Sequence, residues 1–185
     1  MNAGVDEQQS TEDEGPIEIP FVGDLTDSEA ELTDRILSVP PGGECTLFID
    51  SPGGSPYCAI SLTTLLIVRD IKATALVCGE CSSAALWPFA ACQRRVVSPY
   101  SVLLFHPMKW QSEEHVGLAE ASEWARHFGV LEQDMDKLLC TLLGVEQGLM
   151  DKWIRPGRYV SGKELVDAGL AEMLDLNEMV KRRRG

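Results

Sequence analysis

The 185-residue sequence has no apolar run long enough to cross a membrane, and residues 1–16 are polar and acidic. We therefore expect neither a membrane span nor a secretory signal, and we expect the protein in the cytoplasm. A G-x-x-x-x-G-K-[ST] loop is also missing, so ATP hydrolysis is not expected of this chain. The length and the 44% share of hydrophobic residues suit one domain with a sizeable core.

Positive charge is scarce. The formal net charge is −13, and much of the acidic excess lies in residues 1–35, whereas the only basic run is Lys181 to Arg184 at the other end. A nucleic-acid-binding protein needs a basic face to neutralise phosphates. Nucleic acid is therefore not expected as a partner.

A complete metal-binding pattern is missing as well. Cys78-Gly-Glu-Cys81 has the spacing of half a zinc site, but no second Cys-x-x-Cys or His-x-x-x-His pair accompanies it. We therefore expect no metal and no cofactor. The six cysteines are interpreted as reduced core residues of a cytoplasmic protein, and a redox role for Cys78 and Cys81 stays open.

The composition divides the chain into three parts. Residues 1–16 lack aromatic residues and are rich in acid, so they are predicted to be a disordered tail. Residues 17–176 form the predicted domain, and residues 177–185 form a basic C-terminal tail. The domain begins with a short strand at 17–22, in which Pro20 indicates a sheet edge. Thr26-x-x-Glu29 has the form of a capping box that opens a helix extending to about residue 37.

Strands and helices alternate in the rest of the domain. Apolar runs at 46–49, 73–77 and 102–105 predict strands, and the first two are each followed by a small-residue turn and a helical pattern. This alternation predicts an α/β fold with a largely parallel sheet, in which ligands bind beyond the carboxyl ends of the strands.

A long amphipathic helix is predicted between Glu113 and Leu143. Its apolar seam follows a spacing of four and three residues and consists of Trp124, Phe128, Leu131, Met135, Leu138 and Leu142. The seam must be covered, either by the core of this domain or by another subunit.

Three of the predicted turns carry residues suited to nucleophilic catalysis. The turn at 50–54 ends in Gly54, where the lack of a side chain lets backbone N–H groups approach a ligand oxygen. Ser83 lies between a strand and a helix, a sharp turn that projects its hydroxyl, with the amide of Ala84 next to it. His106 directly follows a strand and is the natural base for a serine that is a poor nucleophile alone.

Each of these features also has a plainer interpretation. A serine before a helix usually acts only as its N-cap, the 50–54 composition is common in turns, and a histidine at a strand end is often structural. The combination is stronger than its parts because all three turns are predicted at the same edge of one sheet.

Four segments resemble, in the same order, the proteolytic subunit of the Clp protease, in the crotonase-like superfamily. They are FIDSPGG at 48–54, Gly79-x-x-Ser-Ser83-Ala, Leu104-Phe-His-Pro107, and Tyr159-x-Ser-x-x-Glu-x-x-x-x-Gly169-Leu. The resemblance covers about residues 17–174. It implies an α/β crotonase-like (ClpP-type) fold, a repeated β-β-α spiral with a protruding long helix.

The resemblance also implies a role for each site residue. Ser83 would be the acylated nucleophile and His106 its general base and acid, with the N–H groups of Gly54 and Ala84 as the oxyanion hole. The family has an aspartate as the third catalytic residue. An alignment without gaps puts Trp153 at that position, and a two-residue insertion within 154–157 puts Asp151 there, so Asp151 is the predicted third residue.

A serine endopeptidase that cleaves peptides and unfolded proteins inside a chamber of stacked rings is the function that this resemblance implies. The rings would be homo-oligomeric or include a paralogous subunit. An AAA+ unfoldase is a candidate partner, although the acidic residues 1–15 do not match the hydrophobic docking segment of the family. The main alternative is a catalytically inactive paralogue that acts as a structural or regulatory ring subunit. Acyl-CoA chemistry on the same scaffold is less favoured because it needs no serine–histidine pair.

Overall fold

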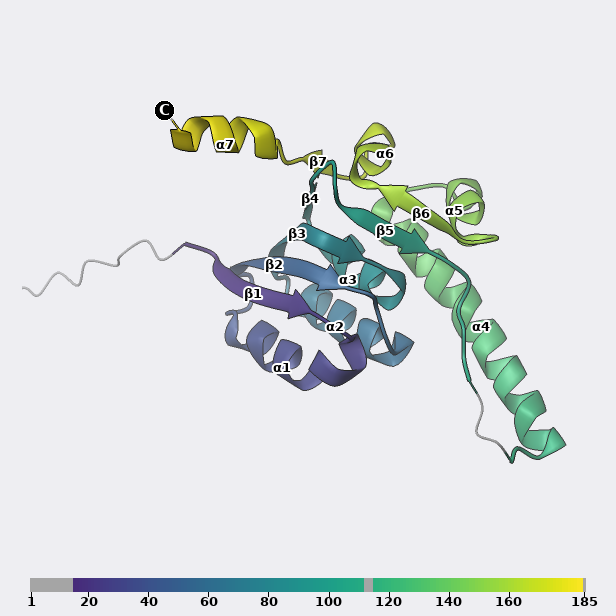
Figure 1. Cartoon of the computed structure of the whole chain (residues 1–185). Coiled ribbons are helices and arrows are strands. Elements are labelled where there is room, and N and C mark those ends of the chain that lie inside the picture. The colour runs from purple at the N-terminus through teal and green to yellow at the C-terminus, as the bar shows by residue number, and fades with distance from the viewer. Residues whose placement is uncertain (1–14, 112–114, 185) are drawn as a thin grey trace, which may run out of the picture.

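The computed structural model describes residues 15–111 and 115–184, so most of the predicted acidic tail and Glu113 lie outside the described residues. Strands and helices alternate from β1 to β4, as the sequence predicts, whereas β5 follows β4 directly and α5 follows α4 directly (Figure 1). They are β1 (Ile17–Val22), α1 (Leu25–Ser38), β2 (Glu44–Ser51), α2 (Pro56–Val68), β3 (Lys72–Cys81), the 3₁₀ turn η1 (Ser83–Ala85), α3 (Leu86–Ala91), β4 (Arg94–Val97), β5 (Val102–Phe105), α4 (Leu118–Leu143), α5 (Gln147–Ile154), β6 (Arg158–Ser161), α6 (Gly162–Asp167), β7 (Glu172–Met173) and α7 (Leu176–Arg184).

The strands of the described residues form one sheet with the order β1-β2-β3-β4-β7, in which every neighbouring pair is parallel. The strand β1 is at the edge, as Pro20 indicates. The strand β5 pairs in parallel with the end of β3, and β6 pairs antiparallel with β5. The prediction of an α/β fold with a largely parallel sheet is therefore confirmed, but the sequence patterns do not predict β4 and β7.

The core lies between the sheet and the helices α1, α2 and α3, which pack against one another and cover one face of it (Figure 1). Side chains that alternate along β2 and β3, among them Leu47, Ile49, Ala75 and Val77, are buried there. Burial on alternate positions is what a half-covered strand requires. The turns after β2 and β3 are thereby held against a rigid layer.

The start of α1 differs from the prediction. The N-cap is Asp24, whose Oδ1 accepts a hydrogen bond from the Thr26 N–H at 2.7 Å. Thr26 instead uses its hydroxyl to accept the Ser55 N–H at 3.0 Å. The capping box predicted at Thr26 is wrong because a carboxylate two residues earlier caps the helix, and the Thr26 hydroxyl is engaged by the turn before α2.

The long helix α4 has 26 residues and begins at Leu118. Its buried side chains, Met135 and Leu139 among them, all belong to its C-terminal half, which packs against α3 and α5. The N-terminal half extends away from the sheet (Figure 1), and there Leu118 is 86% exposed. The domain core therefore covers only part of the predicted seam. At the end of the chain, the basic run lies on the exposed helix α7.

Candidate active site

Ser83 lies at a sharp turn after the end of β3. Ser82 is still extended, but Ser83 has a φ of +53°, in the left-handed region that residues other than glycine rarely adopt. The chain then turns into η1 and α3, and this strand–turn–helix arrangement resembles the one that carries the nucleophile in α/β-hydrolases. A strained backbone at a nucleophilic hydroxyl is a feature of functional sites, because the surrounding structure must hold it there.

Hydrogen bonds of two buried serines, Ser51 and Ser82, hold this turn. The Ser82 N–H donates to the Ser51 carbonyl oxygen at 3.0 Å, and the Ser82 hydroxyl accepts the Leu104 N–H at 3.1 Å. Ser82 therefore ties the end of β3 to both β2 and β5. The Ser51 hydroxyl in turn donates to the Gly23 carbonyl oxygen and accepts the Gly53 N–H. The two buried serines fix the two turns against each other.

Gly53 is a site residue that the sequence motifs did not single out. It has a φ of +100°, and a Cβ added there would lie 2.7 Å from the Ser83 Cβ and 2.8 Å from the Ala84 nitrogen. Only glycine lets the turn after β2 approach the Ser83 backbone so closely. The Gly-Gly pair was the available signal, but the sequence does not say which glycine makes the close contact.

His106 follows β5 directly. Because Glu80 of β3 is level with Val102 of β5, the residues three positions after each, Ser83 and Phe105, reach the same edge of the sheet. His106 Nδ1 lies 2.6 Å from the carbonyl oxygen of Pro107. A carbonyl oxygen can only accept, so this hydrogen bond requires the proton on Nδ1. Nε2 then keeps its lone pair and can accept a proton.

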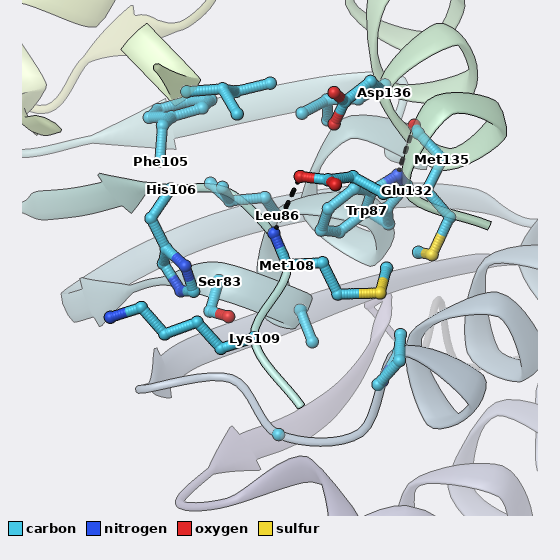
Figure 2. Close-up of a pocket in the computed structure, with 15 residues that line it drawn as sticks. Ser83, Leu86, Trp87, Phe105, His106, Met108, Lys109, Glu132, Met135 and Asp136 are labelled. Carbon is cyan, nitrogen blue, oxygen red and sulfur yellow. Dashed lines mark hydrogen bonds between the residues drawn. The ribbon is translucent and has the colours of Figure 1, made fainter. Parts of the chain in front are cut away.

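One cavity of about 160 Å³ brings these residues together (Figure 2). Four of the five predicted site residues line it, namely Gly54, Ser83, Ala84 and His106. The sequence prediction that the three turns meet at one edge of the sheet is therefore confirmed. The remaining walls come mainly from α3, from the segment after β5 and from α4.

Asp151 does not line this cavity. It lies on the half-exposed side of α5, where its Oδ1 accepts hydrogen bonds from Arg155 at 3.1 Å and Gln147 at 3.2 Å. Within residues 15–111 and 115–184, no carboxylate is hydrogen-bonded to His106. The residue that approaches His106 from the turn before β6 is Gly157, where an added Cβ would lie 3.3 Å from the His106 Cβ. The structure therefore does not bring the predicted third residue to the histidine.

Two carboxylates of α4, Glu132 and Asp136, also line the cavity, and the sequence motifs did not single out either one. The Met108 N–H donates to Glu132 Oε1 at 3.1 Å, and Asp136 Oδ2 pairs with Arg155 at 2.7 Å. Asp136 is 5% exposed, and this burial raises the pKa of its carboxyl although the Arg155 guanidinium opposes the change. The sequence shows these two acids only as neighbours of the apolar seam of the predicted long helix, which does not mark them as cavity residues.

All six cysteines are free thiols. Cys78 is exposed and Cys81 is buried, so the two side chains of the Cys-x-x-Cys segment do not share a face of β3. Burial raises the pKa of the Cys45 thiol to about 11 and raises that of Cys81 well above its usual range. These buried thiols stay protonated and behave as small apolar side chains.

The comparison with solved structures identifies the fold. The chain matches a point mutant of ClpP1 from Listeria monocytogenes with a TM-score of 0.74, over 87% of this chain and 92% of that chain, at 15% sequence identity. No protein-family model matches the sequence, and no curated protein matches it. The chain therefore has a ClpP-like fold, a mixed α/β sheet from which one long helix, α4, extends.

Proposed function

We propose that the protein is a serine endopeptidase of the Clp proteolytic type. The observation that carries the proposal is Ser83, at a left-handed turn after a parallel strand, in one cavity with His106. The ClpP-like fold supports it, because that is the fold of a proteolytic subunit whose motifs this sequence resembles. Peptides and unfolded proteins are the proposed substrates.

The reaction would follow the acyl-enzyme route. Ser83 Oγ attacks the scissile carbonyl carbon while His106 Nε2 takes the hydroxyl proton, and the imidazolium then gives that proton to the departing amine. The N–H groups of Gly54 and Ala84 stabilise the oxyanion. A water molecule, deprotonated by His106, hydrolyses the Ser83 ester and restores the enzyme.

The Pro107 carbonyl gives His106 part of what a carboxylate gives a triad. By accepting the Nδ1 proton at 2.6 Å, it selects the tautomer whose Nε2 can act as a base. A neutral carbonyl stabilises the imidazolium less than a carboxylate does, so we expect a slower enzyme than one with a full triad. Asp151 as a third catalytic residue stays a prediction.

An active-site-directed probe tests the proposal. A fluorophosphonate should add one phosphonyl group to the purified protein, and peptide mapping should assign it to Ser83. The Ser83→Ala variant should lose both the label and the hydrolysis of fluorogenic peptides. Ser122→Ala, which removes an exposed hydroxyl on α4, should keep both. Absence of label in the assembled protein, together with peptide turnover that Ser83→Ala does not reduce, would refute the proposal.

A catalytically inactive ring subunit is the second candidate. It is favoured by the absence of a carboxylate partner on His106 within the part of the chain that the structure describes. In that case the protein would assemble with an active paralogous subunit while Ser83 stayed unreactive. Peptidase activity of the purified protein alone, lost in Ser83→Ala, would exclude this candidate.

Assembly into stacked rings is part of the proposal. The exposed N-terminal half of α4 supports it, because Leu118 and Val130 are large apolar side chains that the domain itself leaves uncovered. Analytical ultracentrifugation of the purified protein should therefore find a large oligomer.

No helix of the described residues is both long and apolar enough to cross a bilayer. We propose the cytoplasm as the location and an AAA+ unfoldase as a partner. Addition of such an unfoldase with ATP should increase the rate at which the protein degrades a folded substrate.

A further inference from the structure

The cavity beside Ser83 combines apolar walls with two acidic groups. Its apolar lining includes Leu86 and Trp87 of α3, Phe105 of β5, Met135 and Leu139 of α4, and Ile154 of α5. Glu132 and Asp136 of α4 line the same space, and Figure 2 shows them across the cavity from Ser83 and His106. A side chain that occupies this cavity can therefore contact both apolar groups and carboxylates.

Glu132 has one oxygen to offer a ligand. Its Oε1 accepts the Met108 N–H at 3.1 Å and lies 3.9 Å from Arg155, which holds the side chain in place. No hydrogen bond to its Oε2 is made by the described part of the chain. The side chain is 27% exposed. Glu132 is therefore a partly buried residue of the cavity lining, and the acceptor capacity of its Oε2 is not used by the described residues.

Asp136 adds to the negative charge of the cavity. Its Oδ2 forms an ion pair with Arg155 at 2.7 Å. Arg155 also forms an ion pair with Asp151 and lies 3.9 Å from Glu132, so one guanidinium group is shared by three carboxylates. Lys109 also lines the cavity, but it lies beside His106 in Figure 2, away from both acids. The acidic side of the cavity thus keeps an excess of negative charge.

We propose that this cavity selects substrates with a long basic side chain, lysine or arginine, at the residue whose carbonyl Ser83 attacks. The inference rests on the proposed function and names its substrate class. The methylene stem would lie on the apolar walls and the cationic end would donate to Glu132 Oε2. An apolar side chain of the same length would strip water from this oxygen without replacing its hydrogen bonds, which costs free energy. An acidic side chain would be repelled.

Two peptide series that differ only in an ammonium group test the proposal. Fluorogenic peptides with lysine before the cleaved bond are compared with the same peptides carrying norleucine, which has a similar stem but no charge. We expect kcat/KM to be about tenfold higher for lysine, the effect of one hydrogen bond to a charged group. Binding of fluorescein-labelled lysine and norleucine peptides to Ser83→Ala, measured by anisotropy, should show a preference of the same size.

The Glu132→Gln variant assigns the effect to one residue. Glutamine keeps an oxygen for the Met108 N–H but loses the charge, so the lysine-to-norleucine ratio should fall about tenfold, to near one. Asp136→Asn should lower the ratio in the same direction by removing the second charge. Asp134→Asn is the matched control, because Asp134 is an exposed acid on the same helix paired with Lys137, and it should leave the ratio unchanged.

The outcomes separate this inference from the proposed function. Equal or better binding and turnover of norleucine peptides by the wild-type protein would overturn it, as would a ratio that Glu132→Gln does not change. If Ser83 takes no fluorophosphonate and no peptide is cleaved, the proposed function fails. The binding ratio still decides the selectivity of the cavity in that case.

Discussion

Ser83 and His106 line the same cavity, but the chain holds them there in different ways. The Ser83 turn is fixed by hydrogen bonds of the buried Ser82 and by the close backbone approach of Gly53. The His106 ring is hydrogen-bonded to the carbonyl of its own neighbour, Pro107, and the glycine beside it, Gly157, offers no side chain.

The positions of the two side chains are therefore determined by different kinds of contact. Ser83, the proposed nucleophile, is positioned by contacts between turns that are distant in sequence, because Gly53 and the hydrogen bonds of Ser82 leave the backbone few alternatives. His106, the proposed base, is positioned by a short contact with its own neighbour, Pro107, and lies beside Gly157. We therefore expect changes at the Ser83 turn to affect stability and activity together, and changes around His106 to affect activity more than stability.

Gly53→Ala should have the largest effect. The added Cβ would lie 2.7 Å from the Ser82 carbonyl oxygen and from the Ser83 Cβ, at a φ of +100° that alanine rarely adopts. We expect a loss of about 3 kcal/mol in the free energy of unfolding, measured in urea, and no detectable labelling of Ser83.

Gly42→Ala is the control for backbone strain alone. Gly42 also has a positive φ, +73°, but a Cβ there would meet no atom within 4 Å. It should lose only about 1 kcal/mol and keep full labelling. If the two variants behave alike, the close contact at Ser83 is not what fixes the turn.

His106→Gln should come next, and it should separate activity from stability. Loss of the base should lower kcat/KM by about 10²-fold to 10⁴-fold. The free energy of unfolding should change by no more than about 1 kcal/mol, because one hydrogen bond between neighbours is lost. His127→Gln is the control, because His127 is an exposed histidine that is hydrogen-bonded to the Tyr57 hydroxyl, and it should leave peptide turnover unchanged. A large destabilisation by His106→Gln would contradict the expectation that changes around His106 affect activity more than stability.

Asp136→Asn should remove a pH-dependent cost in stability that arises in the cavity wall formed by α4. Burial raises the pKa of Asp136 in the folded state, so the folded protein binds this proton more tightly than the unfolded chain does. Wild-type stability should therefore decrease, relative to the variant, as the pH rises from about 4 through the raised pKa. Urea unfolding of both proteins across this range measures the difference, and a constant difference would contradict the assignment.

Asp151→Asn should have the smallest effect on either property. Its ion pair with Arg155 is half exposed, and such pairs contribute about 0 to 1 kcal/mol. If Asp151 instead orients His106 in the assembled protein, kcat should fall about 10⁴-fold, as for the loss of a triad aspartate. Peptide hydrolysis by the assembled variant decides between the two.

The sequence predicts the half of the site that local patterns encode. Apolar runs that end in small residues place Gly54, Ser83 and His106 at one edge of a parallel sheet, and the structure confirms this. The acids Glu132 and Asp136 could not be selected, because their position depends on how the C-terminal half of α4 docks against α3 and α5. Residue periodicity describes a face of a helix but not the surface that it meets.

The remaining differences in the fold have similar causes. The short strands β4 and β7 escape prediction because neither segment has a run long enough to stand out; they form by pairing with each other and, for β4, with β3. Asp24 rather than Thr26 caps α1 because the Thr26 hydroxyl accepts the Ser55 N–H, a contact between distant residues. In each instance tertiary pairing decides the local outcome.

The left-handed backbone at position 83 implies a conflict between folding and chemistry. Glycine would adopt the same φ without steric cost, so Ser83→Gly should be more stable than Ser83→Ala by about 1 kcal/mol and unfold at a higher temperature. The most stable residue here is thus one that cannot form an ester. A Ser83 hydroxyl that forms the proposed ester would therefore be retained at a cost in stability.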